Sequence, residues 1–113
     1  MDGKRSEANI LNDCLVAMSE AGGMVWRQNT GAYKEPKTGR LIRYGLCVGS
    51  SDIIGIAPDG VFVAVECKTA TGRATDKQKR FIENVKRQGG RAGIARCAED
   101  AVGIMLDTAR DGG

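Results

Sequence analysis

The N-terminal segment carries apolar side chains at the spacing of an amphipathic helix. Ser6 suits the N-cap position, because its hydroxyl can accept a hydrogen bond from a backbone N–H group of the first helical turn. The pattern stops at the glycine pair of residues 22–23, which favours the end of a helix. We therefore predict a helix over residues 6–21. Its apolar stripe consists of Ile10, Leu11, Cys14, Leu15 and Met18.

The segment after this helix changes from apolar to polar. Residues 24–27 (Met-Val-Trp-Arg) begin a strand, and residues 28–40 are mostly polar, with several basic side chains. Residues 41–48 could resume a strand or stay partly irregular. We predict a loop before them. A solvated surface loop and a loop that contacts phosphates both fit this composition.

Residues 50–68 predict a β-hairpin around which the rest of the chain is organised. Positions 57–60 (Ala-Pro-Asp-Gly) have turn chemistry, because proline fixes φ and glycine tolerates positive φ. A loop of about three residues centred on Asp59 pairs residues whose numbers sum to about 118. This register sets Asp52 opposite Glu66, on one face of the sheet and with Cβ atoms about 5 Å apart. Because side chains alternate, one face of the second strand carries Phe62, Ala64, Glu66 and Lys68, and the other carries Val61, Val63, Val65 and Cys67.

A second helix follows the hairpin. Thr75 and Gln78 fit a capping box, and the glycine pair 89–90 ends the helix at about residue 88. Gln78 lies in the same helical row as the apolar residues, so it should look inward toward the sheet edge that bears Lys68. The alternative is that Gln78 serves only as a cap. The apolar stripe consists of Phe81, Ile82 and Val85.

The C-terminal segment predicts one more strand and one more helix. Residues 91–97 form a strand that is parallel to the second hairpin strand, because a helix connects the two. Residues 98–109 form a helix, and residues 110–113 should fray. The apolar side of this helix consists of Val102, Met105, Leu106 and Ala109. The element order α-β-β-β-α-β-α predicts an α/β fold, a small mixed β-sheet flanked by helices, in one domain over residues 1–113 with its core at about 6–109.

Composition excludes several classes of protein. No apolar run approaches the roughly 20 residues of a membrane span, and the N-terminus lacks an apolar signal-peptide core, so we expect a cytoplasmic protein without a membrane partner. The chain has no histidine, which rules out histidine-based triads and histidine zinc sites. The four cysteines have no CxxC spacing, and we expect them to be buried, reduced packing residues: Cys14, Cys47, Cys67 and Cys97.

Asp52, Glu66 and Lys68 form the most informative group of ionisable residues. Carboxylate oxygens are the hard ligands that Mg²⁺ prefers, and a bound metal lowers the pKa of a water that can attack a phosphate. A lysine beside it can orient that water or balance the growing negative charge. The structural alternative is an ion-paired trio at a sheet edge, but buried charge seldom stabilises a fold better than apolar packing.

The residues Asp52 and Glu66-Cys67-Lys68, together with Glu7 and Gln78, resemble the virus-type replication-repair nuclease (VRR-NUC) domain of the PD-(D/E)XK nuclease superfamily. The resemblance covers roughly residues 7–99 and implies a restriction-endonuclease-like core. Ser51 departs from it, because the superfamily name expects proline before the aspartate. That position has no catalytic side chain.

The resemblance implies a role for each motif residue. Asp52 and Glu66 would bind Mg²⁺ or Mn²⁺, with the backbone carbonyl of Cys67 completing the shell, and Lys68 would assist the attacking water. Gln78 would position that water or the phosphate, and Glu7 would support a metal directly or through a water. A first-turn glutamate favoured by the helix dipole is the alternative for Glu7.

The implied substrate is DNA. Stand-alone domains of this kind resemble phage and prokaryotic enzymes and share their fold with Holliday-junction resolvases, so we expect a homodimer that cleaves branched DNA such as a four-way junction. A flap or restriction-like nuclease and a non-catalytic DNA-binding module are the alternatives. The predicted DNA contacts are Arg27, Tyr33, Lys34, Lys37, Arg40, Arg43, Arg73 and Lys77.

Overall fold

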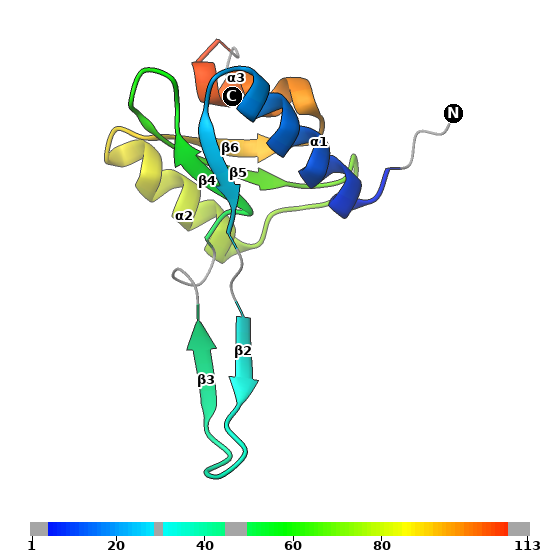
Figure 1. The fold of residues 1–113 in the computed structure, drawn as a ribbon, viewed down its shortest axis with the longest axis vertical. Coiled ribbons are helices and arrows are strands. Elements are labelled where there is room, and N and C mark those ends of the chain that lie inside the picture. Colours follow the sequence, from blue (N-terminus) through cyan, green and yellow to red (C-terminus); the bar gives the residue numbers. More distant parts are fainter. Residues whose placement is uncertain (1–4, 29–30, 45–49, 109–113) are drawn as a thin grey trace.

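The structure is a computed structural model that describes residues 5–28, 31–44 and 50–108. Its helices and strands follow one another along the chain as Figure 1 labels them. They are α1 (Glu7–Glu20), β1 (Met24–Arg27), β2 (Gly31–Lys34), β3 (Leu41–Tyr44), β4 (Ile53–Ile56), β5 (Phe62–Cys67), α2 (Asp76–Arg87), β6 (Arg91–Ala95) and α3 (Ala98–Leu106).

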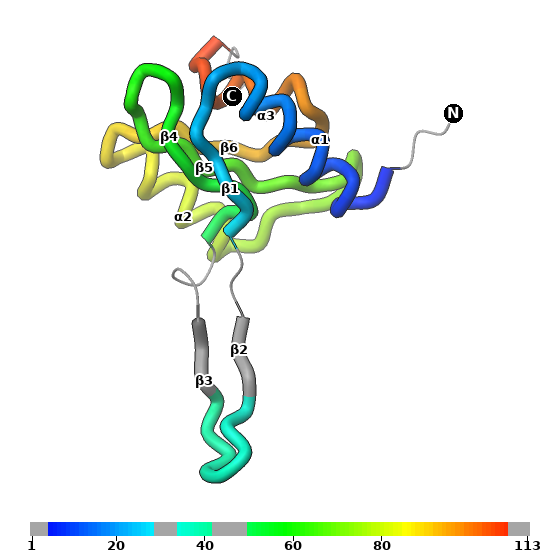
Figure 2. The backbone as a smooth tube through the Cα atoms, in the orientation of Figure 1, coloured from blue at the N-terminus to red at the C-terminus, as the bar shows by residue number. Residues whose placement is uncertain are grey.

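Four strands form one mixed sheet in the order β1-β4-β5-β6. The pairs β1–β4 and β4–β5 are antiparallel, and β5–β6 is parallel. The parallel pair is connected through α2, which lies on the face of the sheet opposite to α1 and α3 (Figure 2). The α/β prediction, a small mixed sheet flanked by helices, is therefore confirmed.

The predicted hairpin register is also confirmed. Ile53 lies opposite Val65 and Ile56 lies opposite Phe62, so the ladder leads directly to Asp52 beside Glu66. The turn closes with a hydrogen bond from Gly60 N to the carbonyl of Ala57 at 2.8 Å. Gly60 has a φ of 89°, a conformation that favours glycine over residues with a Cβ.

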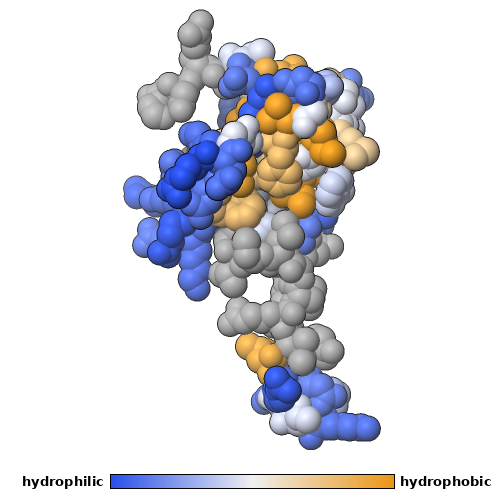
Figure 3. All heavy atoms as spheres, turned by 90° about the vertical axis from the view of Figure 1, so that its left-hand side faces the viewer, coloured by the Kyte–Doolittle hydropathy of each residue, from blue (hydrophilic) through white to orange (hydrophobic). Residues whose placement is uncertain are grey.

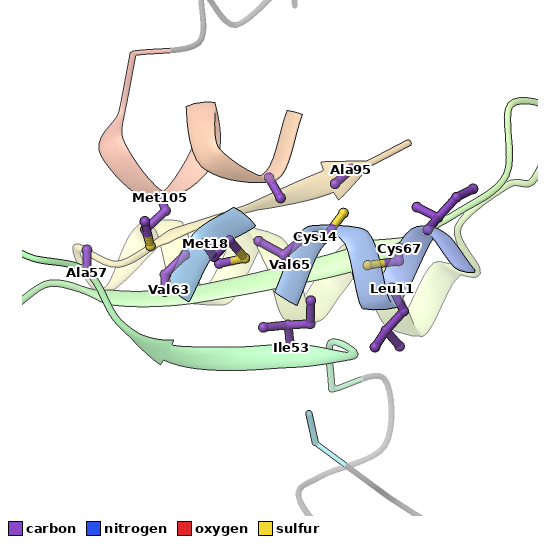
Figure 4. Close-up of a cluster of buried hydrophobic side chains, with 12 residues drawn as sticks. Leu11, Cys14, Met18, Ile53, Ala57, Val63, Val65, Cys67, Ala95 and Met105 are labelled. Atoms are coloured by element: carbon purple, nitrogen blue, oxygen red, sulfur yellow. The ribbon is translucent and has the colours of Figure 1, made fainter. Parts of the chain in front are cut away.

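The main core lies between the sheet and the helix pair α1–α3 (Figure 4). The inward residues of β5 pack there against the stripe of α1, as alternation along the strand requires. A smaller cluster on the other face joins β4, β5 and β6 to Ile82 of α2. Fully buried members of the main core include Cys14, Met18, Ile53, Val63, Val65, Cys67 and Met105.

The predicted loop at 28–40 is only partly a loop. β2 and β3 pair antiparallel in a two-stranded sheet of their own, outside the four-stranded sheet (Figure 1). The tip is organised by Glu35, whose Oε1 accepts hydrogen bonds from Lys37 N at 2.9 Å and Thr38 N at 2.8 Å. The hairpin is an insertion between β1 and β4. Without it, the element order is the predicted α-β-β-β-α-β-α.

Two predictions near the C-terminus were wrong. Cys97 is exposed, because the strand ends at Ala95 and Cys97 is the N-cap residue of α3. Leu106 is also exposed, at 38%, because α3 ends there, whereas the predicted Met105 is buried together with Ala101 and Gly103. Cys14, Cys67 and Cys97 carry free thiols. Cys47, Ala109 and residues 110–113 lie outside the described residues. Within the described residues, no helix is long and apolar enough to span a membrane.

Candidate active site

Two carboxylates lie side by side at one end of the β4–β5 pair. Glu66 is the penultimate residue of β5 and is only 1% exposed, and Asp52 precedes β4 and is half-buried. The Asp52 carboxylate accepts a hydrogen bond from the backbone N–H of Cys67 at 2.9 Å. This bond fixes the Asp52 side chain against the end of β5, where it faces Glu66.

Lys68 and Gln78 converge on the same oxygen of Glu66. Gln78 Nε2 donates a hydrogen bond to Glu66 Oε2 at 2.8 Å, and Lys68 Nζ lies 3.6 Å from that oxygen. The backbone of Lys68 continues the β5–β6 ladder, because its N–H donates to the carbonyl of Ala95. The Lys68 side chain is 12% exposed, so its charge acts across a poorly solvated gap.

Gln78 has a structural and a site contact at the same time. The side-chain oxygen Oε1 of Gln78 accepts a hydrogen bond from the backbone N–H of Thr75 at 2.9 Å. The backbone N–H of Gln78 donates to the hydroxyl Oγ1 of Thr75 at 3.1 Å, and the two bonds together form a complete capping box. The side-chain amide nitrogen Nε2 of Gln78 takes no part in the capping box and donates to Glu66. The start of α2 therefore anchors the Gln78 amide over the carboxylate pair.

The electrostatics of the site disfavour an ionised Glu66. Burial, followed by repulsion from Asp52, raises the pKa of Glu66 to about 8 despite the opposing effect of Lys68. Glu66 Oε1 is buried and has no hydrogen-bond partner. A buried acceptor of this kind, beside a second carboxylate, is a place where a proton or a cation stabilises the protein.

The residues present fit a divalent cation that would be held by two carboxylates, one backbone carbonyl and several waters. Among the described residues, no three acidic, histidine or cysteine side chains are close enough to hold a metal ion. The side-chain ligands would therefore be Asp52 and Glu66, with the Cys67 carbonyl as the predicted backbone ligand. Mg²⁺ commonly binds to one or two carboxylates and keeps several waters, so two carboxylates suffice. The Cys67 side chain lies on the other face, buried in the main core with Cys14.

Glu7 lies near the site but outside its carboxylate pair. It is exposed, in the first turn of α1, and its charge contributes to the raised pKa of Glu66. Both predicted roles of Glu7, at the metal directly or through a water, therefore stay predictions.

The predicted DNA contacts whose side chains the structure describes are all exposed. Arg73 and Lys77 are exposed on the link from β5 and on the first turn of α2. Arg27 is exposed at the end of β1. Lys34, Lys37 and Arg40 are exposed on the β2–β3 hairpin and its tip. The side chains of Tyr33 and Arg43 lie outside the described residues.

Two residues near the site, Gln28 and Arg96, are not among the predicted site residues, and the structure also defines the surroundings of Ser51. Gln28 N donates to the Asp52 carbonyl at 2.7 Å, which extends the β1–β4 ladder and sets Gln28 opposite Asp52 on the site face. Ser51 is buried with an unpartnered hydroxyl, in keeping with a position where proline is expected. The Arg96 guanidinium binds the carbonyls of Thr69 and Gly72 and so holds the link between β5 and α2.

The fold and these residues define a class. A mixed sheet that carries two carboxylates and a lysine at the end of its central hairpin is the arrangement expected of a PD-(D/E)XK nuclease. The family model described as VRR-NUC domain matches residues 9–99 of the chain. The chain therefore belongs to the VRR-NUC family of nuclease domains, and the resemblance is confirmed. A comparison with curated protein sequences gives no significant match.

Proposed function

We propose that this chain is a metal-dependent endodeoxyribonuclease whose site consists of Asp52, Glu66, Lys68 and Gln78. The observation that carries the proposal is the buried Glu66 carboxylate, which has Asp52 beside it, Lys68 and Gln78 on one oxygen and no partner on the other. A purely structural ion pair would satisfy both oxygens. The same geometry gives a cation and an anionic substrate a place to bind.

Each side chain has a separate task in the proposed hydrolysis. Asp52 and Glu66 would hold Mg²⁺ or Mn²⁺, and Glu7 would assist directly or through a water. When bound, such an ion would supply a water of lowered pKa and would offset charge on the phosphate. Lys68 orients the attacking water and stabilises the negative charge that develops at the phosphate. Gln78 keeps the Glu66 carboxylate in place, since its amide is itself fixed by the capping box.

The proposed substrate is branched DNA, and the proposed active form is a homodimer of a single nuclease domain. Support comes from the exposed basic side chains on the β2–β3 hairpin and on α2, which can follow phosphates without reading bases. Two copies related by a two-fold axis would present two sites to two strands of a four-way junction.

A cleavage panel tests the proposal. Wild-type protein, Lys68→Ala and the control Glu20→Gln, at an exposed residue at the end of α1, are incubated with a four-way junction, a flap and a linear duplex. We expect cleavage with Mg²⁺ or Mn²⁺ and none with EDTA, a preference for the junction, and a rate at least about a hundredfold lower for Lys68→Ala. Binding of the junction by Lys68→Ala should change little.

The other outcomes each have a meaning. Full activity of Lys68→Ala would show that this site does not take part in the cleavage reaction. A preference for the flap by a monomer would make the chain a flap nuclease. Junction binding without cleavage under any metal would make it a DNA-binding module. The mass of the protein in solution is measured on the same samples.

A further inference from the structure

Helix α2 covers only part of its face of the sheet. It packs on β5 and β6, and the apolar residues of its inner side contact Ile54, Ala64 and Ala92. Four large apolar side chains on the same face remain exposed, beside the helix rather than under it. They are Met24 (61% exposed), Trp26 (45%), Ile56 (38%) and Phe62 (41%), and we call them the open apolar face.

The strand register joins the open apolar face to the catalytic residues. Met24 lies opposite Ile56, which lies opposite Phe62, and Trp26 lies opposite Ile54. The next row on this face contains Gln28, Asp52 and Glu66. Rows on one face are two residues apart along each strand, which is about 7 Å. Trp26 is thus one row from Asp52, a separation close to that of successive nucleotides in an extended strand.

The surface beside the open apolar face is basic. Along α2, five basic residues outnumber Asp76 and Glu83, and all five are exposed. Figure 3 shows apolar side chains reaching the surface next to a strongly hydrophilic area. A second copy docked here by two-fold symmetry would bring like charges of two α2 helices together, whereas a polyanion would be attracted. The basic residues are Lys77, Lys79, Arg80, Lys86 and Arg87.

We infer that the open apolar face binds unpaired bases of the DNA strand, with Trp26 as the stacking platform. This inference rests on the proposed function, because it places the bases next to the scissile phosphate at Asp52 and Glu66. Bases stack on aromatic side chains while basic residues follow the backbone in single-strand binding sites. Paired bases in a duplex cannot present their flat faces to a sheet. The substrate class is therefore branched DNA in which bases at the branch point, beside the cleavage position, are unpaired when bound.

Trp26 is the only tryptophan of the chain, so its fluorescence reports this contact alone. Wild-type protein in EDTA, where no cleavage occurs, is titrated with a single-stranded oligothymidine, with an abasic strand of the same length and with a blunt duplex. A base stacked on the indole quenches its emission. We expect quenching by oligothymidine only. We also expect Trp26→Ala to bind oligothymidine about fivefold to a hundredfold more weakly by anisotropy, with Trp26→Phe close to wild type.

Several results would overturn the inference. Equal quenching by duplex or abasic strand would show that phosphates rather than bases are sensed, and oligothymidine binding without quenching would place the strand elsewhere. A wild-type dimer that Trp26→Ala converts to a monomer would assign the open apolar face to a second copy. Trp26→Phe keeps the test valid if Trp26→Ala does not fold. Quenching without any metal-dependent cleavage would contradict the proposed function alone, and cleavage without quenching would contradict this inference alone.

Discussion

Replacing Glu66 with glutamine should make the metal-free protein more stable while removing its activity. The side chain keeps its shape and keeps an oxygen that can accept the hydrogen bond from Gln78 Nε2. What it loses is a carboxylate that is almost completely buried and lies beside Asp52. Active sites often retain charged groups at the expense of stability, so the two effects should separate in this variant.

The magnitude follows from the pKa of Glu66, which rises from an ordinary value of 4.5 to about 8 in the folded protein. At pH 7 the unfolded carboxyl is ionised and the folded one is mostly protonated, a difference that costs about 3 kcal/mol. The lost contact with Lys68 offsets part of this. We expect Glu66→Gln to gain about 1–3 kcal/mol at pH 7 in EDTA.

The sign of the pH dependence is a second part of the same prediction. Because the folded pKa is the higher one, the wild-type carboxyl does not destabilise the fold below about pH 4.5. Stability is lost as the pH rises toward 8, by at most about 1.4 kcal/mol per unit. Glu66→Gln should lack this loss.

Urea denaturation of both proteins in EDTA, at several values between pH 4.5 and 8.5, measures the effect. A gain of this size raises the midpoint by about 1–2 M urea at pH 7. Glu20→Gln, an exposed site on α1, is the matched control and should change the midpoint little. A Glu66→Gln protein that is less stable than wild type at pH 7, or that shows the same pH dependence, would refute the reasoning about burial.

Three further changes test other parts of the structure. Gln78→Glu keeps an acceptor for the capping box but adds a carboxylate beside Glu66. Cleavage should slow at least tenfold, roughly the cost of one misplaced charge, while the helix content measured by circular dichroism stays unchanged. A normal cleavage rate would show that Gln78 has no role in the reaction. Gly55→Ala would place a Cβ 2.2 Å from the Met24 carbonyl oxygen and should cost about 1–3 kcal/mol in urea denaturation, and an unchanged midpoint would contradict the tight β1–β4 approach. Replacing residues 31–44 with a short glycine-serine linker should preserve the core fold and flatten the salt dependence of junction binding, whereas an unchanged slope would exclude the hairpin from phosphate contact.

The site was predictable from the sequence where local chemistry determines geometry. The turn at 57–60 fixes the register of β4 and β5, and that register alone places Asp52 beside Glu66. The capping box at Thr75 likewise fixes where Gln78 begins α2. Both depend on residues close together in the chain.

The parts that were missed depend on distant or unusual interactions. β2 and β3 have few β-branched residues, and the hairpin tip is closed by the Glu35 carboxylate, which composition alone does not reveal. Gln28 and Trp26 reach the site face only because β1 pairs with β4 across a long connection. Nothing in the sequence of β1 indicates which strand it pairs with. Cys97 was expected to be buried because it follows an apolar segment that predicts a strand, yet the strand ends before it.

Anomalous scattering from crystals soaked in Mn²⁺ tests the central claim most directly. We predict a peak between the carboxylates of Asp52 and Glu66 in the wild-type protein, and no peak there in Glu66→Gln. A protein that cleaves DNA with Mn²⁺ but shows its peak elsewhere, or shows the same peak without the Glu66 carboxylate, would contradict the account.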